Sequence, residues 1–391
     1  MVSGRLPPLV EPAATLTRGE AERYSRHLII PDLGLDGQKR LKNAKALVVG
    51  AGGLGSPALM YLAAAGVGTI GIIEDDVVEE SNLQRQIIHG ESDVGRSKAR
   101  SAADAIGRLN HLVTVRPHEF RLTADNAVEL FQEYDLVIDG TDNFATRYLV
   151  NDAAILAHKP YVWGSIYSFE GQASVFWEDA PGGRGVNYRD VFPDPPPPGM
   201  APSCAEGGVL GVLCASIASV MATEAIKLIT GIGESLLGRL MIYDALRMDY
   251  RTITVRKDPE APRIIELVDY EQFCGATSAG TPYAADSITP LELRDLLRAG
   301  DKVALIDVRE PAEWEINHID GARLIPKSVI DTGAGLSDVP HDRIPVLYCK
   351  TGVRSAAAIA VLKQAGFTDA LQLEGGIVAW ARQLEPDMVM Y

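Results

Sequence analysis

Two sets of residues in this sequence are suited to group-transfer chemistry. The first comprises GAGGLGS at Gly50–Ser56, SNLQRQ at Ser81–Gln86 and TDN at Thr141–Asn143, and it predicts a nucleotide site that transfers adenylate. The second is CKTGVRS at Cys349–Ser355, which supplies a reactive thiol. Together the two chemistries suggest a single pathway, in which ATP activates a carboxylate and sulfur then attacks it.

The glycine motif is typical of a turn that binds phosphate. Gly50, Gly52 and Gly55 satisfy G-x-G-x-x-G, with Gly53 between them, so backbone amides and the positive end of a helix can receive phosphate. Glu74 stands about 20 residues further on, where a dinucleotide site has its acidic ribose ligand. Nicotinamide or flavin binding therefore stays open at this point.

Polar residues beyond Glu74 favour a triphosphate. They include two cations and two amides, which an oxidoreductase that binds an uncharged nicotinamide would not need. A triphosphate would need them, because its oxygens carry several negative charges. The residues are Asp76, Asn82, Arg85, Gln86 and Lys98.

These motifs as a set resemble the adenylyltransferase family that activates ubiquitin-like sulfur carriers. That family includes the bacterial molybdopterin-synthase adenylyltransferases and the thiamin-pathway relatives of ubiquitin-activating enzymes. The resemblance covers about Leu16–Cys274, and it also includes RYSRH at Arg23–His27 and SCAEGGVLG at Ser203–Gly211. It implies a doubly wound, Rossmann-like domain that binds ATP and adenylates the C-terminal glycine of a carrier protein.

The resemblance implies a role for each charged residue. Asp142 would hold Mg²⁺, which prefers carboxylates and phosphate oxygens, while Arg85 and Lys98 would stabilise the polyphosphate. Arg26 resembles the family's arginine that reaches into the neighbouring subunit's site, which implies a homodimer. Arg147 would guide the incoming carrier tail. The carrier carboxylate itself attacks the α-phosphate, so this step needs no enzymic nucleophile.

Two departures from the family pattern matter. The family usually has Asp where this chain has Glu74, so a longer acid must contact the ribose. Many relatives also carry two Cys-x-x-Cys pairs that bind structural zinc. Here Asp190 and nearby residues replace the first pair and Cys274 is the only remnant of the second, so zinc is not expected.

The chain from about Ser287 onward resembles a rhodanese, which implies sulfur transfer through a cysteine persulfide. The motifs that carry the resemblance are IDVRE at Ile306–Glu310, HIDGA at His318–Ala322, the loop Cys349–Arg354, and EGGIVAW at Glu374–Trp380.

The Cys349 loop suits sulfur chemistry. A thiol at the end of a strand, with loop amides and a helix N-terminus around it, favours the thiolate and can hold an anionic persulfide. Lys350 and Arg354 add positive charge. A Cys-loop phosphatase is the near competitor, but its Cys and Arg are further apart than the four intervening residues of this loop. The shorter ring suits sulfur better than phosphate.

The other cysteines have different expected roles. In related fusion proteins the cysteine at the position of Cys204 can form a covalent link with the activated carrier, and the alternative is a packing residue in a crossing loop. Cys214 lies in an apolar helix and is expected in the core. The seven histidines form no metal-ligand spacing.

Alternating strands and helices must position the nucleotide motifs. The alternation argues for an α/β fold with a parallel, doubly wound sheet covered on both faces. Asp179–Pro202, which contains a run of prolines, is expected to form a long, mobile crossing loop. The apolar helix after it, at Val209–Thr230, is expected to be buried rather than in a membrane. Strands are expected at Lys45–Val49, Thr69–Ile73, Leu136–Ile138, Tyr161–Ile166, Leu240–Asp244 and Thr252–Arg256, and helices at Ser56–Ala65 and Lys98–Asn110.

The chain is expected to contain two domains. Residues 1–270 form the adenylyltransferase domain, in which the proline-rich residues 1–15 are loose. The small and polar residues 271–286 form a linker, and residues 287–391 form a small α/β rhodanese domain. In that domain Thr289 and Glu292 predict a capping box at the first helix.

Composition limits the partners and the compartment. The 391 residues include 37 Lys and Arg against 52 Asp and Glu, a net charge of −15, which argues against direct binding of nucleic acid. Four widely separated cysteines are typical of a reducing compartment, so the cytoplasm is expected. No basic and apolar signal peptide is visible at the N-terminus, and no membrane partner is expected.

The expected function is activation of a ubiquitin-like sulfur carrier with a C-terminal diglycine, for molybdopterin and related biosynthesis. ATP supplies the leaving group, and a Cys349 persulfide, loaded from thiosulfate or from a cysteine desulfurase, supplies the sulfur. Two other classes stay open. One is an NAD-type oxidoreductase fused to a sulfur domain, and the other is a non-catalytic scaffold that binds a ubiquitin-like protein.

Overall fold

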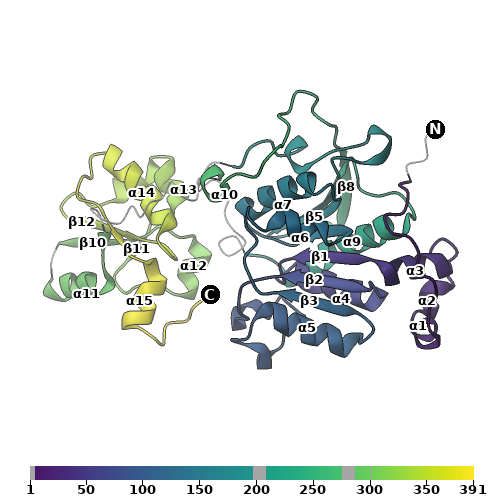
Figure 1. Ribbon diagram of the computed structural model, residues 1–391. Coiled ribbons are helices and arrows are strands. Elements are labelled where there is room, and N and C mark those ends of the chain that lie inside the picture. Colours follow the sequence, from purple (N-terminus) through teal and green to yellow (C-terminus); the bar gives the residue numbers. More distant parts are fainter. Residues whose placement is uncertain (1–4, 197–207, 275–286, 301) are drawn as a thin grey trace. The chain divides into compact units, whose positions relative to one another are not determined.

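The chain forms two compact units, each with its own sheet and its own buried core (Figure 1). The computed structural model describes residues 5–196, 208–274, 287–300 and 302–391. Cys204 and most of the predicted linker 271–286 lie outside these residues. The first unit ends at Cys274, and the second contains the chain from Ser287 onward.

An eight-stranded sheet forms the centre of the first unit. Its strands are β1 (Lys45–Val49), β2 (Thr69–Ile73), β3 (Thr114–His118), β4 (Leu136–Asp139), β5 (Tyr161–Tyr167), β6 (Glu170–Phe176), β7 (Arg239–Asp244) and β8 (Asp249–Thr254).

The strand order is β3-β2-β1-β4-β5-β6-β7-β8, with parallel pairing from β3 to β5 and antiparallel pairing from β5 to β8. The parallel half, with chain order reversing on either side of β1, confirms the doubly wound prediction. The prediction of a parallel sheet is wrong for β6, β7 and β8. Two-residue and four-residue turns join β5 to β6 and β7 to β8, and such short connections permit only antiparallel pairing.

Helices cover both faces of this sheet, as predicted (Figure 1). Along β1, Ala46 and Val48 face one buried cluster with α4, α5 and α9, whereas Leu47 and Val49 face a second cluster with α6 and α7. This alternation follows from the period of two residues in a strand. The helices of the unit are α1 (Arg18–Arg23), α2 (Ser25–Leu28), α3 (Gly34–Asn43), α4 (Gly55–Ala65), α5 (Lys98–Leu109), α6 (Ala127–Gln132), α7 (Phe144–Leu156), α9 (Gly211–Thr230) and α10 (Tyr270–Phe273).

The apolar helix α9 is a core helix. By length and composition it could also cross a membrane, with a mean hydropathy of 1.7. In the fold it packs against α4 and β5, and Leu213, Ile217 and Met221 are fully buried. It ends at Gly231, whose φ of 72° is the left-handed conformation that commonly closes helices.

The start of the described chain is held against the core, so the prediction of a loose N-terminus is wrong for residues 5–15. Leu6 and Val10 are both only 6% exposed and belong to the first core cluster. The Leu9 N–H donates to the Leu228 carbonyl at 3.0 Å, and the Ala13 N–H donates to the Lys39 carbonyl at 3.1 Å. The prolines of this segment do not prevent this packing, because two apolar side chains and the backbone hydrogen bonds anchor the chain.

The segment predicted as a long crossing loop is partly ordered by its own turns. Within the described residues 179–196, 3-10 turns form at Pro181–Gly183 and Tyr188–Asp190. Tyr188 is buried at 2% exposure and packs edge-on against Tyr148 of α7. An aromatic anchor therefore fixes this part of the segment, and the prediction of a mobile loop is wrong there.

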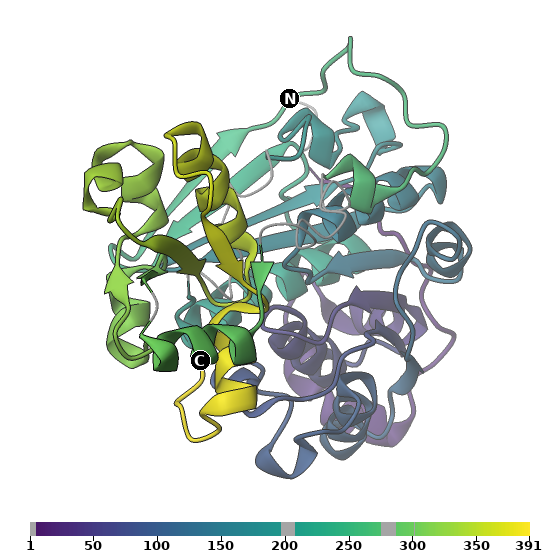
Figure 2. The ribbon, with the colours of Figure 1, turned by 90° about the vertical axis from the view of Figure 1, so that its left-hand side faces the viewer.

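The second unit contains a five-stranded, wholly parallel sheet in the order β11-β10-β12-β13-β9. Figures 1 and 2 show α11 and α15 on one side of it and α13 and α14 on the other. The predicted capping box of Thr289 and Glu292 is confirmed at the start of α11. The elements are β9 (Ser287–Ile288), α11 (Pro290–Ala299), β10 (Val303–Asp307), α12 (Pro311–Ile316), β11 (Arg323–Leu324), α13 (Lys327–Asp331), β12 (Ile344–Tyr348), α14 (Val353–Gln364), β13 (Leu371–Leu373) and α15 (Gly376–Leu384).

A core substitution can test the anchoring of the N-terminal segment. Leu6→Ala removes buried methyl groups, and we expect it to lower the free energy of unfolding by about 2 kcal/mol in urea titrations. The matched control is Leu246→Ala on a side chain that is 73% exposed, which should change stability by less than about 0.5 kcal/mol. Equal effects of the two variants would show that residues 5–15 are not held in the core.

Candidate active sites

A tight glycine turn joins β1 to α4. Gly50 has a φ of 90°, which favours glycine, and a Cβ on Gly55 would lie 1.9 Å from the Gly50 carbonyl oxygen. No larger residue fits at Gly55 without opening the turn. The turn lies at the carboxyl edge of the parallel strands, beside a cavity of about 380 Å³ that it lines. Ligands of doubly wound sheets bind at this edge.

Glu74 connects the glycine turn to the end of β2. Its carboxylate accepts hydrogen bonds from the Ala51 N–H at 3.0 Å and from the Asp76 N–H at 3.1 Å. The acid that the sequence predicts as the ribose ligand therefore also fixes the backbone of the turn. It lines the cavity together with Asp75 and Asp76, and one carboxylate oxygen of each lies within 4.8 Å of the others.

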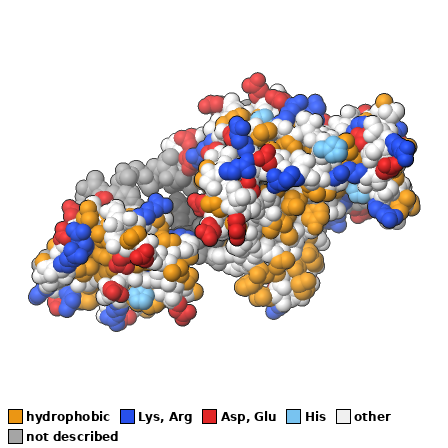
Figure 3. Space-filling model, turned by 90° about the horizontal axis from the view of Figure 1, so that it is seen from below, with side chains coloured by type: hydrophobic (Ala, Val, Ile, Leu, Met, Phe, Trp, Pro, Cys, Tyr) orange, Lys and Arg blue, Asp and Glu red, His pale blue; other side chains and the backbone are white. Residues whose placement is uncertain are grey.

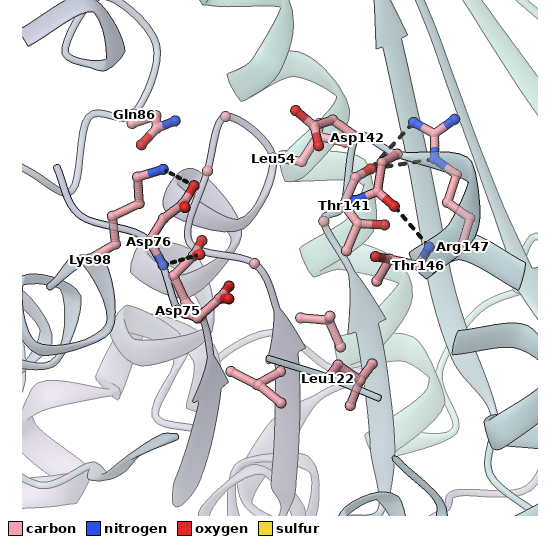
Figure 4. A pocket seen from close by; sticks show the side chains of 18 of the residues that line it. Leu54, Asp75, Asp76, Gln86, Lys98, Leu122, Thr141, Asp142, Thr146 and Arg147 are labelled. Carbon is pink, nitrogen blue, oxygen red and sulfur yellow. Dashed lines mark hydrogen bonds and ion pairs between the residues drawn. The ribbon is translucent and has the colours of Figure 1, made fainter. Parts of the chain in front are cut away.

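The predicted polyphosphate-binding residues line one wall of the cavity (Figure 4). The Lys98 ammonium lies 3.0 Å from the Asp76 carboxylate, and Lys98 is 8% exposed while Asp76 is 71% exposed. Arg85 donates to the Ser81 carbonyl at 3.1 Å. The Gln86 amide oxygen is buried and has no hydrogen-bond partner within the described residues. An unsatisfied polar atom at a cavity wall is suited to a polar ligand.

Two further polar residues support this wall. Asn82 does not line the cavity, and its amide oxygen accepts from the Glu79 N–H at 3.3 Å, which caps a short turn. His89, for which no role was predicted, is buried, and burial lowers its pKa. Its Nε2 donates to the Ala51 carbonyl at 3.2 Å, and its Nδ1 accepts from the Ser101 hydroxyl at 2.8 Å. Only the folded chain brings His89 to the glycine turn.

The TDN motif forms the opposite wall, as Figure 4 shows. Asp142 is exposed and lines the cavity, across from Asp76 and Lys98. Arg147 is only 7% exposed, and its guanidinium donates to the Thr141 carbonyl at 3.3 and 3.4 Å. It also lies over the Phe144 ring, 5.4 Å from the centroid. Arg147 therefore braces the turn that presents Asp142, in addition to lining the cavity.

Asp139, which the sequence analysis did not single out, holds the same turn from below. Its side chain is fully buried at the end of β4 and accepts from the Thr141 N–H at 3.0 Å and the Thr141 hydroxyl at 2.7 Å. Burial raises its pKa to about 6. The only signal in the sequence was an acid at the end of an apolar strand.

Arg26 is not among the described residues that line this cavity. Arg26 is exposed on α2, which precedes α3 and β1 in the chain, whereas the cavity is lined by residues that follow the carboxyl ends of β1, β2 and β4. Cys204 lies outside the described residues.

In the second unit, Cys349 follows β12 at the start of a tight loop. The Gly352 N–H donates to the Cys349 sulfur at 3.1 Å, and the Ser355 hydroxyl lies 3.6 Å from it. Gly352 has a φ of 112°, and its carbonyl accepts from Ser355 at 3.0 Å and from Gln372 at 2.5 Å. Because the loop donates to the sulfur, it suits a thiolate or persulfide anion.

The EGGIVAW motif holds the first residues of this loop. The Ile377 N–H donates to the Cys349 carbonyl at 2.9 Å, and the Val378 N–H donates to the Lys350 carbonyl at 3.2 Å. A Cβ on Gly376 would lie 2.4 Å from the Cys349 carbonyl oxygen. The glycine pair therefore allows α15 to approach the loop and to satisfy both carbonyls with its N-terminal amides.

Arg354 is held by a carboxylate of α12. It forms two hydrogen bonds with Glu313, at 2.6 and 2.7 Å, and the two side chains are 17% and 9% exposed. Burial by itself raises the pKa of the Glu313 carboxyl. The hydrogen bonds that it accepts from Arg354 and from the Glu310 N–H together outweigh burial, and the pKa is lowered to about 2. The predicted cation of the loop is thus one half of a fixed ion pair.

Two family models match the chain. The model of the ThiF family matches residues 24–263, and the model of the rhodanese-like domain matches residues 289–383. The chain therefore belongs to the ThiF family, with a rhodanese-like domain as its second unit.

Relatives that align over nearly the whole chain have the names of enzymes. The probable adenylyltransferase/sulfurtransferase MoeZ of Mycobacterium tuberculosis is 72% identical to this chain over 392 residues. The alignment covers 100% of both chains. The adenylyltransferase and sulfurtransferase MOCS3 of Bos taurus is 39% identical and covers 97% of this chain and 90% of its own length. This chain is accordingly a fused adenylyltransferase and sulfurtransferase.

The first unit also has relatives of its own. The sulfur carrier protein adenylyltransferase of Thermus thermophilus is 53% identical over 66% of this chain and 98% of its own length. The solved structure of Escherichia coli MccB with ATP has a TM-score of 0.53 at 22% identity, covers 61% of this chain and 73% of its own, and supports the fold alone. Family membership excludes the oxidoreductase and scaffold classes that the sequence left open.

The buried Asp139 predicts a specific dependence of stability on pH. The pKa of Asp139 is raised from 3.8 to about 6 in the folded protein, so between these pH values folding takes up a proton. The free energy of unfolding of the wild type therefore falls as the pH rises through this range. Asp139→Asn does not titrate. We expect the stability of the variant relative to the wild type to rise by about 2–3 kcal/mol from about pH 4 to about pH 7, in urea titrations. A difference that is constant with pH would contradict the prediction.

Proposed function

We propose that the first unit adenylates the C-terminal glycine of a ubiquitin-like sulfur carrier and that a Cys349 persulfide then converts it to a thiocarboxylate. The observation that carries the proposal is the pairing of two sites in one chain. A cavity lined by a glycine turn, Lys98 and Asp142 suits ATP, and a thiol lies in a loop that donates hydrogen bonds to it. The related MOCS3 and sulfur carrier adenylyltransferase carry the matching activities in their names.

In the first half-reaction, the chain positions two substrates and stabilises charge. The carrier carboxylate attacks the α-phosphate of ATP and pyrophosphate leaves, with the phosphates on the amides of the glycine turn. Arg85 and Lys98, which both line the cavity, would neutralise the polyphosphate once Lys98 exchanges its Asp76 partner for phosphate oxygens. Gln86 would offer its unsatisfied amide oxygen as an acceptor for a nucleotide donor.

The cavity also fits a magnesium ion. The exposed Asp142 carboxylate would hold it, and Glu74, Asp75 and Asp76 form a separate group of carboxylates on the opposite wall. Oxygen ligands of this kind are those that Mg²⁺ prefers, and the bound ion would neutralise charge on the phosphates. Asp139 and Arg147 hold the Asp142 turn in place.

In the second half-reaction, the Cys349 thiolate carries sulfur. With thiosulfate as donor, the Cys349 thiolate attacks the outer sulfur, the S–S bond of thiosulfate breaks, sulfite leaves and a persulfide forms on Cys349. The persulfide of a cysteine desulfurase is the alternative donor. The terminal sulfur then attacks the acyl carbon and AMP leaves, so an acyl disulfide joins the carrier to Cys349. Attack of a second thiol on the Cys349 sulfur releases the thiocarboxylate. Cys204 is our candidate for a covalent link with the carrier during transfer.

The proposed setting is molybdopterin and related sulfur-dependent biosynthesis in the cytoplasm. We propose no direct nucleic acid or membrane partner. The net charge of −15 supports this, and on the face shown in Figure 3 basic and acidic side chains are interspersed rather than gathered in a basic surface. The candidate membrane helix α9 is already packed in the core.

We also propose that the chain holds no structural zinc. Asp190 is part of an ionic network. Its carboxylate accepts hydrogen bonds from the Asn187 and Asp258 N–H groups, at 2.7 and 3.0 Å, and it lies 3.6 Å from the Lys257 ammonium. Lys257 also binds Glu178, at 2.6 Å. An ammonium group at the centre of the network is a poor neighbour for a cation, so the donor set does not suit zinc.

Single substitutions can separate the two half-reactions. Asp142→Ala should lower carrier-dependent pyrophosphate exchange at least about 100-fold, because a charged ligand of the nucleotide site is lost. The same variant should keep sulfur transfer from thiosulfate to cyanide within about twofold, because Cys349 belongs to the other unit. Cys349→Ala should give the reverse pattern and yield no thiocarboxylate by mass spectrometry of the carrier. Loss of both activities in either folded variant would contradict the division.

We propose that Arg26, which resembles the family's arginine of the neighbouring subunit, completes the site of a second copy of the chain. Arg26 is exposed on α2, and the neighbouring Ile29 and Ile30 are 70% and 46% exposed, as expected of an interface. Arg26→Ala and Asp142→Ala should each abolish pyrophosphate exchange. Mixing them should restore up to about a quarter of the wild-type activity, because a heterodimer contains one intact site. Absence of complementation, with subunit exchange verified by native mass spectrometry, would exclude the homodimer role of Arg26.

A further inference from the structure

A segment after α15 folds back onto the elements that hold the sulfur loop. The Asn317 side-chain amide donates to the Val389 carbonyl at 2.5 Å. The Tyr391 hydroxyl accepts from the Arg309 guanidinium at 2.8 Å and donates to the Glu313 carboxylate at 2.6 Å. One phenol therefore bridges Arg309 of the IDVRE motif and Glu313 of α12.

Tyr391 contacts Lys350 of the Cys349 loop directly, and Glu313 links it to Arg354 of the same loop. The Lys350 ammonium lies over the Tyr391 ring, 4.5 Å from its centroid, which is cation–π geometry. Glu313, held by the phenol, binds Arg354 through both carboxylate oxygens. Lys350 directly follows Cys349, and Arg354 closes the loop.

A buried ion pair supports Tyr391. Arg309 and Asp307 are both fully buried and form an ion pair at 2.6 Å, and Arg309 also donates to the Asn317 side chain at 2.9 Å. Burial raises the pKa of the Tyr391 phenol, so at neutral pH the hydroxyl keeps the proton that it donates to Glu313. A buried network of this kind, satisfied at each step, fixes side-chain positions.

We propose that Tyr391 is a positioning residue for the sulfur site: it holds Lys350 and the Glu313–Arg354 pair so that the loop presents a defined positive charge to anionic sulfur donors. This proposal rests on the proposed role of Cys349 as the sulfur carrier. Tyr391 touches no reacting atom, and it acts through the two cations. The sequence motifs gave no sign of it, because Tyr391 lies outside all of them.

The charge beside Cys349 can be measured by alkylation with a neutral and an anionic reagent. Iodoacetamide reports access and thiolate content, iodoacetate reports these and the local charge, and peptide mass mapping assigns the rate to Cys349. We expect Tyr391→Ala to lower the ratio of iodoacetate to iodoacetamide rates about three- to tenfold, because Lys350 loses its aromatic support. Tyr391→Phe keeps the ring and should give an intermediate ratio. Both variants should raise KM for thiosulfate more than they lower kcat.

Controls distinguish this role from simple unfolding. Val389→Ala should keep the wild-type ratio. The Val389 side chain is exposed, and only its backbone carbonyl accepts the hydrogen bond from Asn317. Local unfolding would raise both rates together, because Cys349 is only 1% exposed, and a ratio unchanged in both Tyr391 variants would overturn the proposal. If instead Cys349→Ala kept full sulfur transfer, the proposed function would fail while the alkylation ratios would still report on Tyr391.

Discussion

The contact on which the adenylation site depends is the close approach of Gly55 to the Gly50 carbonyl. A Cβ at Gly55 would lie 1.9 Å from that oxygen, so a side chain there would push α4 away from β1. Because residue 55 is glycine, a single tight turn joins β1 to α4, and residues of this turn line the cavity. The interactions of Glu74 and His89 with Ala51 then fix a backbone path that glycines alone would leave loose.

The sulfur site uses the same constraint in another fold. Cys349 also follows a central parallel strand, and here Gly352 takes the positive φ and Gly376 permits the close approach of a helix. In both units, a glycine turn lies at the carboxyl ends of parallel strands, where backbone N–H groups can bind an anion, and in the second unit the Gly352 N–H donates to the Cys349 sulfur. Such donors need no reorganisation when the anion arrives, which is why they suit phosphate in one case and sulfur in the other.

Both sites also hold a cation against a carboxylate. Lys98 pairs with Asp76 in the nucleotide cavity, and Arg354 pairs with Glu313 behind the sulfur loop. The two pairs differ in their surroundings. Asp76 is 71% exposed, so water can solvate it when phosphate takes Lys98, whereas Glu313 is 9% exposed and is held by further hydrogen bonds. The first pair is suited to exchange its partner, and the second is suited to keep a fixed geometry.

The sequence by itself determined the two units, the parallel half of the large sheet, the strand at Lys45–Val49 and the motifs that line both sites, because strand and helix periods and glycine spacing are local properties. Only the tertiary structure decided the antiparallel half of the sheet, the anchoring of Leu6 and Val10, and the partners of the motif residues. His89 and Tyr391 act across long distances in sequence, through hydrogen bonds that no spacing rule contains. Asp139 holds a turn only two residues away, but its complete burial, which raises its pKa, comes from the fold. Pairing between distant residues depends on how the chain closes its loops and fills its core, and that is a property of the whole fold.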